Sequence, residues 1–217
     1  MILAIVSGKG GVGKSTIAYN LGALVNGVVV DADIGAPDLP YGTGPTIHDV
    51  LGDRTSVSDA VIRRSSVRLL PCGRSLHGAR ACDITQLPDV LDQLEAAHET
   101  VIVDCPAGIS AVTGLVLQAA DRCLIVTTGT DRALSQTLRI RELVRSLNVG
   151  IDRVAVNNIS GDSTPGDARR QTGVPVTTID HSEKLKTAQQ SETPITDSVP
   201  GCSAANQLKQ LKTELSI

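Results

Sequence analysis

The chain has 217 residues, a formal net charge of −3, 41% hydrophobic residues and only 1% aromatic residues. This length suits one α/β domain with an ample core, and the composition excludes a disordered chain. The charge excludes a general basic bias toward nucleic acid or anionic lipid. Five cysteines without a paired framework predict a reducing cytoplasm, and no apolar stretch approaches the ~20 residues of a membrane helix.

The first apolar run, residues 2–7, predicts a buried strand, and a helical pattern begins near Ser15. The loop between them reads G-K-G-G-V-G-K-S-T and matches G-x-x-x-x-G-K-[ST] completely. Its glycines let backbone N–H groups surround phosphate oxygens, while Lys14 reaches the β/γ-phosphates and Ser15 ligates Mg²⁺. We therefore predict a phosphate-binding P-loop made of Gly8, Lys9, Gly10, Gly11, Val12, Gly13, Lys14, Ser15 and Thr16.

Two later apolar runs end in acidic residues. The run 28–34 leads into D-A-D-I-G with Asp31 and Asp33, and the run 100–104 leads into D-C-P-A-G with Asp104 and Gly108. Because ligands of parallel sheets bind at the carboxyl ends of the strands, we expect these acids to meet the P-loop at one site.

Strand and helix patterns alternate along the whole chain. Further strands are predicted at 67–71, 123–128, 153–157 and 174–179, and helices at 15–25, 87–97, 134–147 and 204–215. This alternation predicts an α/β fold with a doubly wound, mostly parallel sheet flanked by helices, as in P-loop NTPases. We find no linker, and residues 1–217 are expected to form a single domain.

A second lysine makes the P-loop unusual. Lys9 crowds positive charge against Lys14, which is unfavourable unless polyphosphate lies between them. The run K-G-G-V-G-K-S-T resembles the deviant Walker A signature of the MinD/ParA family of ATPases, and D-A-D-I-G and D-C-P-A-G are similar to that family's switch I and switch II. The likeness spans nearly all of the chain and is closest to the MinD-like branch.

The resemblance implies a role for each site residue. Lys9 would reach across a dimer to the partner's nucleotide, Asp33 would orient the attacking water, and Asp31 would support the switch and the Mg²⁺ shell. Asp104 would hold Mg²⁺ through water and the Gly108 N–H would contact the γ-phosphate. Strand-end hydrogen bonding to the neighbouring loop is the structural alternative for Asp31.

The base pocket is less well defined by sequence. The resemblance places the Asn157 amide against adenine, although a strand-end turn asparagine is a serious alternative. Relatives often carry I-P-x-D near the base, where this chain has Ile179, Asp180, His181 and Ser182. One wall of the pocket therefore departs from the family pattern.

The resemblance implies a Mg²⁺-dependent ATP hydrolase that dimerises on ATP and acts as a spatial-positioning switch. ATP and Mg²⁺ are the expected cofactors, and turnover would be slow without a partner. The expected partners are a second copy of the chain and an unidentified activating or cargo protein. We predict a cytoplasmic location, with a peripheral position at the membrane as the alternative.

Three alternatives stay open. Leu208, Leu211 and Leu215 share a helical face, but without an aromatic anchor we favour packing on the sheet over membrane binding. A ParA-like partition ATPase would bind DNA nonspecifically, and a metallocluster or metal-insertion ATPase would need Cys72 and Cys82 to meet at a dimer interface. The basic residues that would serve DNA binding are Arg132, Arg139, Arg141, Arg145, Arg169 and Arg170.

Overall fold

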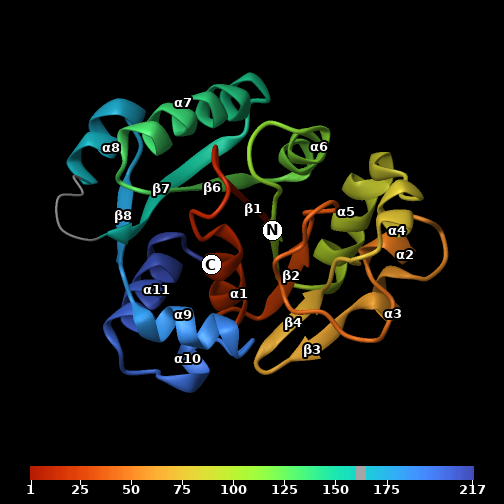
Figure 1. Ribbon diagram of the computed structural model, residues 1–217. Coiled ribbons are helices and arrows are strands. Elements are labelled where there is room, and N and C mark those ends of the chain that lie inside the picture. The colour runs from red at the N-terminus through yellow and green to blue at the C-terminus, as the bar shows by residue number, and fades with distance from the viewer. Residues whose placement is uncertain (160–164) are drawn as a thin grey trace.

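The computed structural model describes residues 1–159 and 165–217. Its strands form one eight-stranded sheet in the order β3-β4-β2-β5-β1-β6-β7-β8 (Figure 1). Only β3 runs antiparallel to its neighbour β4, and the other pairs are parallel. The strands are β1 (Ile2–Val6), β2 (Gly27–Asp31), β3 (Ile62–Arg64), β4 (Val67–Leu70), β5 (Thr100–Asp104), β6 (Arg122–Thr127), β7 (Gly150–Ile159) and β8 (Val176–Asp180).

Helices connect the strands and cover both faces of the sheet (Figure 1). The long ones carry apolar residues at helical spacing on the side that meets the sheet. The helices are α1 (Lys14–Gly22), α2 (Ile47–Val50), α3 (Val57–Ala60), α4 (Leu76–Arg80), the 3₁₀ turn η1 (Ile84–Gln86), α5 (Leu87–Ala97), α6 (Ala111–Ala119), α7 (Asp131–Ser146), α8 (Pro165–Thr172), α9 (Glu183–Gln190), α10 (Ile195–Ser198) and α11 (Ser203–Glu214).

Each face of the sheet builds its own core. Along β1, residues 2, 4 and 6 join the core under α5, α6 and α7, whereas residues 3 and 5 join the core under α1, α9 and α11. This alternation follows from the two-residue period of a strand, and all five β1 side chains are buried. The central strands are therefore rigidly held, and their carboxyl ends give a fixed base for the loops that follow.

The predicted fold class is confirmed, with corrections to individual elements. The strand predicted at 28–34 ends at Asp31, where Ala32 N donates to Asp104 O (2.9 Å) and the chain turns away. The short edge strand β3 and the helix α6 were not predicted. The predicted packing of the last helix is confirmed, because Leu208, Leu211 and Leu215 are fully buried against the sheet.

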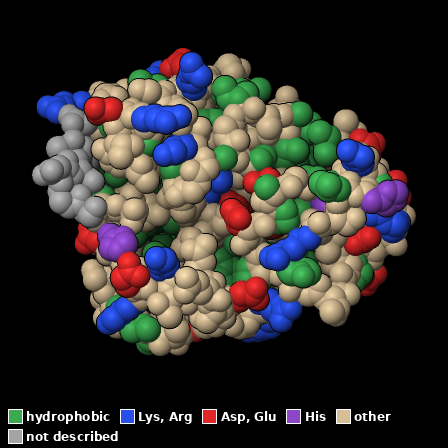
Figure 2. Space-filling model, in the orientation of Figure 1, with side chains coloured by type: hydrophobic (Ala, Val, Ile, Leu, Met, Phe, Trp, Pro, Cys, Tyr) green, Lys and Arg blue, Asp and Glu red, His purple; other side chains and the backbone are tan. Residues whose placement is uncertain are grey.

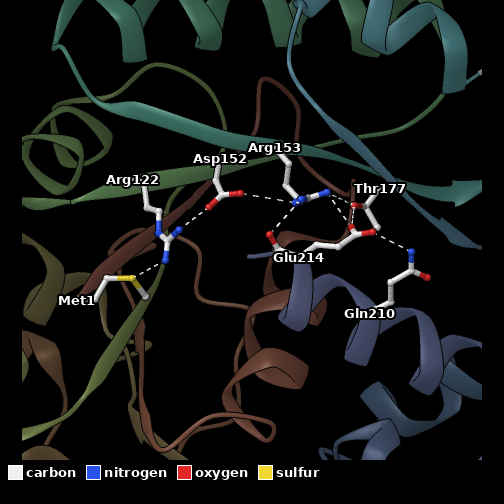
Figure 3. A network of polar contacts seen from close by, with 7 residues as sticks. All are labelled: Met1, Arg122, Asp152, Arg153, Thr177, Gln210 and Glu214. Carbon is white, nitrogen blue, oxygen red and sulfur yellow. Dashed lines mark hydrogen bonds and ion pairs between the residues drawn. The ribbon is translucent and has the colours of Figure 1, made fainter. Parts of the chain in front are cut away.

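A network of polar contacts links α11 to residues near the amino-terminal ends of β6, β7 and β8 (Figure 3). Arg122 Nη1 lies 2.7 Å from Asp152 Oδ2, and Arg153 Nη1 lies 2.8 Å from Glu214 Oε2. Arg153 Nη2 also donates to Glu214 O (3.1 Å), and the Thr177 hydroxyl donates to the Glu214 carboxylate. This network lies away from the carboxyl ends of the strands, so it serves the fold and not the site.

Candidate functional site

The glycines of the P-loop are required by its geometry. Gly11 (φ +74°) and Gly13 (φ +95°) adopt left-handed conformations directly before α1. A Cβ at Gly13 would overlap Asn157 Nδ2, and a Cβ at Gly8 would overlap the backbone carbonyl of Gln136 in α7. The loop is thus fitted tightly between the end of β7 and α7, and its N–H groups lead into the amino terminus of α1.

The two P-loop lysines lie in different environments. Lys14 is buried, with 7% of its surface exposed, whereas Lys9 is exposed. The Ser7 hydroxyl donates to Lys9 O (2.9 Å) and fixes the loop backbone at its start. Within residues 1–159 and 165–217, no ion pair involves the Lys9 ammonium. Lys9 is therefore available to a phosphate or to another molecule.

Asp31 and Asp104 are neighbours across β2 and β5, where they pair in register. Asp31 accepts hydrogen bonds from Asp33 N (3.2 Å) and Leu39 N (3.3 Å), so it holds the loop that follows β2. This contact is the structural alternative considered for Asp31, and it leaves the predicted support of switch I in place. The two acids occupy the carboxyl ends of β2 and β5, and β5 is the neighbour of β1, which leads into the P-loop.

Burial raises the pKa of both acids. The pKa of Asp31 rises to about 8 because of burial and the nearby Asp104 carboxyl. The pKa of Asp104 rises to about 7 through burial, although the Lys14 charge and the neighbouring Ser15 hydroxyl oppose this rise. Among the described residues Asp104 Oδ1 has no hydrogen-bond partner. A buried, unpartnered carboxylate oxygen beside a serine hydroxyl fits a hydrated Mg²⁺ ion.

Asp33 lies at the start of the loop after β2 and is partly exposed. Its Oδ1 accepts from Ala36 N (3.2 Å), and the Lys14 ammonium is close enough to lower its pKa, although burial raises the pKa overall. The structure thus brings Asp33, Asp104 and Lys14 to one place from three separate segments. Lys9, by contrast, is exposed on the P-loop.

The backbone of the switch I segment is anchored by two residues that sequence analysis did not single out for this role. His48 Nε2 lies 3.1 Å from Ile34 O and 3.3 Å from Cys72 Sγ, which in turn donates to Asp33 O (3.5 Å). Both side chains are buried, and burial raises the pKa of the Cys72 thiol far above its usual range. Gly73 leaves room for the ring, since a Cβ there would lie 2.5 Å from His48 Nδ1. No sequence motif predicts the contact between His48 and Cys72.

Two groups that were predicted to contact the nucleotide already make hydrogen bonds within the protein. The Gly108 N–H donates to Ser7 O (2.8 Å), so its predicted contact with a γ-phosphate requires that hydrogen bond to break. Asn157 Nδ2 donates to Val12 O (2.8 Å), so this amide supports the P-loop from β7. The second proton of the amide and its carbonyl oxygen are what remain for a base.

A cavity of about 230 Å³ opens beside the P-loop. It connects the loop glycines to the ends of β7 and β8 and to α9. The described residues that line it are Gly11, Val12, Gly13, Thr16, Asn157, Asn158, Asp180, His181, Ser182, Leu185, Lys186 and Gln189. The segment that departs from I-P-x-D therefore does form a wall next to the phosphate loop.

Comparison with known proteins assigns the family. Residues 3–195 match the model of the CobQ/CobB/MinD/ParA nucleotide binding domain. The chain belongs to this family. An uncharacterized ATP-binding protein of Methanocaldococcus jannaschii is 33% identical over 173 residues, and the septum site-determining protein MinD of Synechocystis is 31% identical over 172 residues.

The matches cover 75% and 73% of this chain but only 66% and 64% of those two relatives, so the chain spans about two thirds of their length. The structure of MinD complexed with Mg-ADP from Pyrococcus horikoshii has a TM-score of 0.93 at 23% identity. That likeness covers 99% of this chain and 95% of the other, and it shows the fold that the CobQ/CobB/MinD/ParA domain adopts here.

Two of the alternatives within the CobQ/CobB/MinD/ParA family gain structural detail. The described residues contain no group of three or more His, Cys, Asp or Glu that could hold a metal ion, and Cys72 is buried. Arg132, Arg139 and Arg145 are exposed on α7, which packs against α8. Figure 2 shows basic side chains over this region of the surface.

None of the described helices is long and apolar enough to span a bilayer.

Proposed function

We propose that this chain is a Mg²⁺-dependent ATPase that forms a dimer on binding ATP and acts as a MinD-like spatial-positioning switch. The observation that carries the proposal is a P-loop holding one buried lysine, Lys14, and one exposed lysine, Lys9. The relatives named as an ATP-binding protein and as MinD support the same assignment, as does the structure of a MinD with Mg-ADP.

Phosphate binding would use the P-loop backbone, Lys14 and the amino terminus of α1. Ser15 and, through water, Asp104 would hold Mg²⁺, whose charge offsets that of the β- and γ-phosphate oxygens. The unpartnered Asp104 Oδ1 supports this placement. Thr16 would complete the cradle, and the cavity beside Gly11 and Gly13 would take the base.

Hydrolysis requires a water molecule held in line with the γ-phosphate. Asp33 would orient it, and two observations support this role: the Lys14 charge lowers the pKa of Asp33, and Asp31 accepts a hydrogen bond from Asp33 N. Release of the Gly108 N–H from Ser7 O would let switch II follow the γ-phosphate. Without a partner to order these loops, turnover would be slow.

Dimer formation would place a second copy over the phosphates. Two ammonium groups on one short loop repel each other, and this repulsion is relieved when Lys9 instead approaches the phosphates of the other copy. The dimer forms only as far as ATP binds it more tightly than the monomer. An activating or cargo protein would then recognise one of the two states.

The test is the variant Lys9→Ala, with Lys209→Ala on α11 as the matched lysine control. Lys9→Ala should keep ATP affinity within about threefold, lose the ATP-dependent dimer, and lower turnover by about tenfold or more, the effect of one charge-assisted contact. Light scattering after size exclusion, with ATP and with ADP, measures the dimer. An ATP-dependent dimer and normal turnover in Lys9→Ala would refute the proposal.

A second candidate, nonspecific DNA binding, is favoured by the exposed arginines of α7. If it is correct, the ATP-bound protein should retard arbitrary duplex DNA, and the affinity should fall steeply with salt. The triple variant Arg132→Ala, Arg139→Ala and Arg145→Ala should abolish retardation while keeping ATP binding. Retardation that is unchanged in this variant, or absent in the parent at low salt, would rule the candidate out.

A further inference from the structure

We infer that His181 is the platform on which the base of the nucleotide stacks. This inference rests on the proposed binding of a nucleotide at the P-loop and specifies which residue recognises the base. His181 follows β8 and lines the cavity of about 230 Å³ beside Gly11 and Gly13. Its imidazole is the only aromatic ring among the described residues that line this cavity.

The edge of the imidazole ring is already occupied. His181 Nε2 lies 3.0 Å from Glu183 Oε1, and His181 Nδ1 lies 2.7 Å from Asn158 Oδ1. Both ring nitrogens thus have partners, and the Asn158 backbone adopts a left-handed conformation (φ +59°). A ligand in the cavity therefore meets the ring through its face and not through a hydrogen bond to its nitrogens.

The backbone on both sides of the ring is fixed in advance. Asp180 N donates to Gln207 Oε1 (3.1 Å), while Gln207 Nε2 donates back to Asp180 Oδ2 (2.8 Å). His181 N donates to Ile159 O (2.9 Å), and the Ser182 hydroxyl caps α9 by accepting from Leu185 N (3.2 Å). A ring held at its edges and along its backbone loses little freedom when a base binds.

A flat aromatic ring at the wall of a cavity is what a purine stacks on, and such stacking tolerates any base because every base has a π-face. The chain has no Phe or Trp, and its two tyrosines, Tyr19 and Tyr41, do not line this cavity. Asn157, the other candidate for the base, already donates to Val12 O. The ring of His181 is therefore the aromatic surface that the described lining of this cavity offers to the base.

The experiment compares a nucleotide with a ligand that lacks a base. Calorimetry measures the affinities of magnesium-bound AMP-PNP, a nonhydrolysable ATP analogue, and of magnesium tripolyphosphate. The variants are His181→Ala, His181→Phe and the matched control His98→Ala, a histidine at the end of α5 outside the cavity. His181→Phe keeps a stacking face but loses both hydrogen bonds of the ring edge.

His181→Ala should weaken AMP-PNP binding about tenfold, the loss of one stacked base, and leave tripolyphosphate binding unchanged. His181→Phe and His98→Ala should stay within about twofold of the parent. Equal weakening of both ligands in His181→Ala, unchanged AMP-PNP affinity, or a His181→Phe variant as weak as His181→Ala would overturn the inference. If the parent binds AMP-PNP no more tightly than tripolyphosphate, both this inference and the proposed nucleotide function fail.

Discussion

Three glycines of the P-loop differ in what their backbone and surroundings tolerate. Gly10 does not have a left-handed φ, and a Cβ added there would lie 3.9 Å from its nearest neighbour, Ala107 Cβ. Gly11 has a left-handed φ but open space around it. Gly13 combines a left-handed φ with overlap against Asn157 Nδ2. Alanine at Gly10 would meet neither obstacle, alanine at Gly11 only backbone strain, and alanine at Gly13 both strain and overlap. Comparing the three positions therefore separates the two effects.

We predict that alanine at these positions lowers the free energy of unfolding in the order Gly10→Ala, Gly11→Ala, Gly13→Ala. Gly10→Ala should be nearly neutral, Gly11→Ala should cost about 1–2 kcal/mol for the left-handed backbone, and Gly13→Ala should cost more. Urea unfolding without nucleotide measures the three values. Adding Asn157→Ala to Gly13→Ala should recover the part due to overlap, and equal costs at all three positions would contradict the geometry.

At the residue scale, the sequence predicts the chemical type of the site residues better than it predicts which side chains contact each other. The P-loop residues and the acids Asp31, Asp33 and Asp104 were predicted because their motifs fix residue type and spacing. The pair of His48 and Cys72 could not be predicted, because their contact joins residues 24 positions apart with no shared motif. The same holds for the hydrogen bond from Asn157 to the P-loop, which spans 145 positions.

At the scale of elements, α11 depends on a single acid near its end. Burial would raise the pKa of Glu214, but hydrogen bonds from Thr177 and Gln210 and the charge of Arg153 lower it overall. A carboxylate whose pKa is lower in the folded state stabilises the fold above its unfolded pKa of about 4.3. That contribution is lost as the pH falls through the lower, folded pKa.

Glu214→Gln should therefore lower the free energy of unfolding by about 1 kcal/mol at pH 7, a value that allows for partial exposure of the pair. The difference from the parent should shrink as the pH falls from 5 through the lowered folded pKa of Glu214, below which the parent also lacks the charge. Urea unfolding at each pH measures it. Glu142→Gln, which removes the exposed partner of Arg141, is the control and should have little effect at either pH. A Glu214→Gln deficit that stays constant from pH 5 down to the onset of acid unfolding would exclude this account.

Elements with strong apolar runs were the predictable ones. The helix expected at 87–97 begins and ends as predicted, since α5 spans Leu87–Ala97. The strand β3 has only three residues, none of them buried, so it has no apolar pattern to detect. Segments of four residues such as α2 and α10 are likewise too short for a helical period to show.

At the scale of the whole molecule, the two ends of the sheet differ in what they carry: one end holds contacts that stabilise the fold, and the other holds the candidate site. The amino-terminal edge is fastened by the network from Met1 through Arg153 to Glu214 (Figure 3), and the carboxyl ends carry the acids, the P-loop and the cavity. This division follows from parallel strands, which direct all their carboxyl ends to one side. The alternation of strands and helices was therefore enough to predict where the site lies.

The close fit of Gly8 against Gln136 has a mechanical consequence. A single added carbon at Gly8 would overlap the backbone of Gln136, so a displacement of the loop toward α7 would meet the backbone of that helix. That helix is a stiff rod of 16 residues, about 24 Å long, with its arginines on the outer surface. The phosphate loop and the helix that carries the exposed arginines are therefore in direct contact, so a nucleotide that shifts this loop is expected to be felt by a protein or polymer that binds the outer surface of α7.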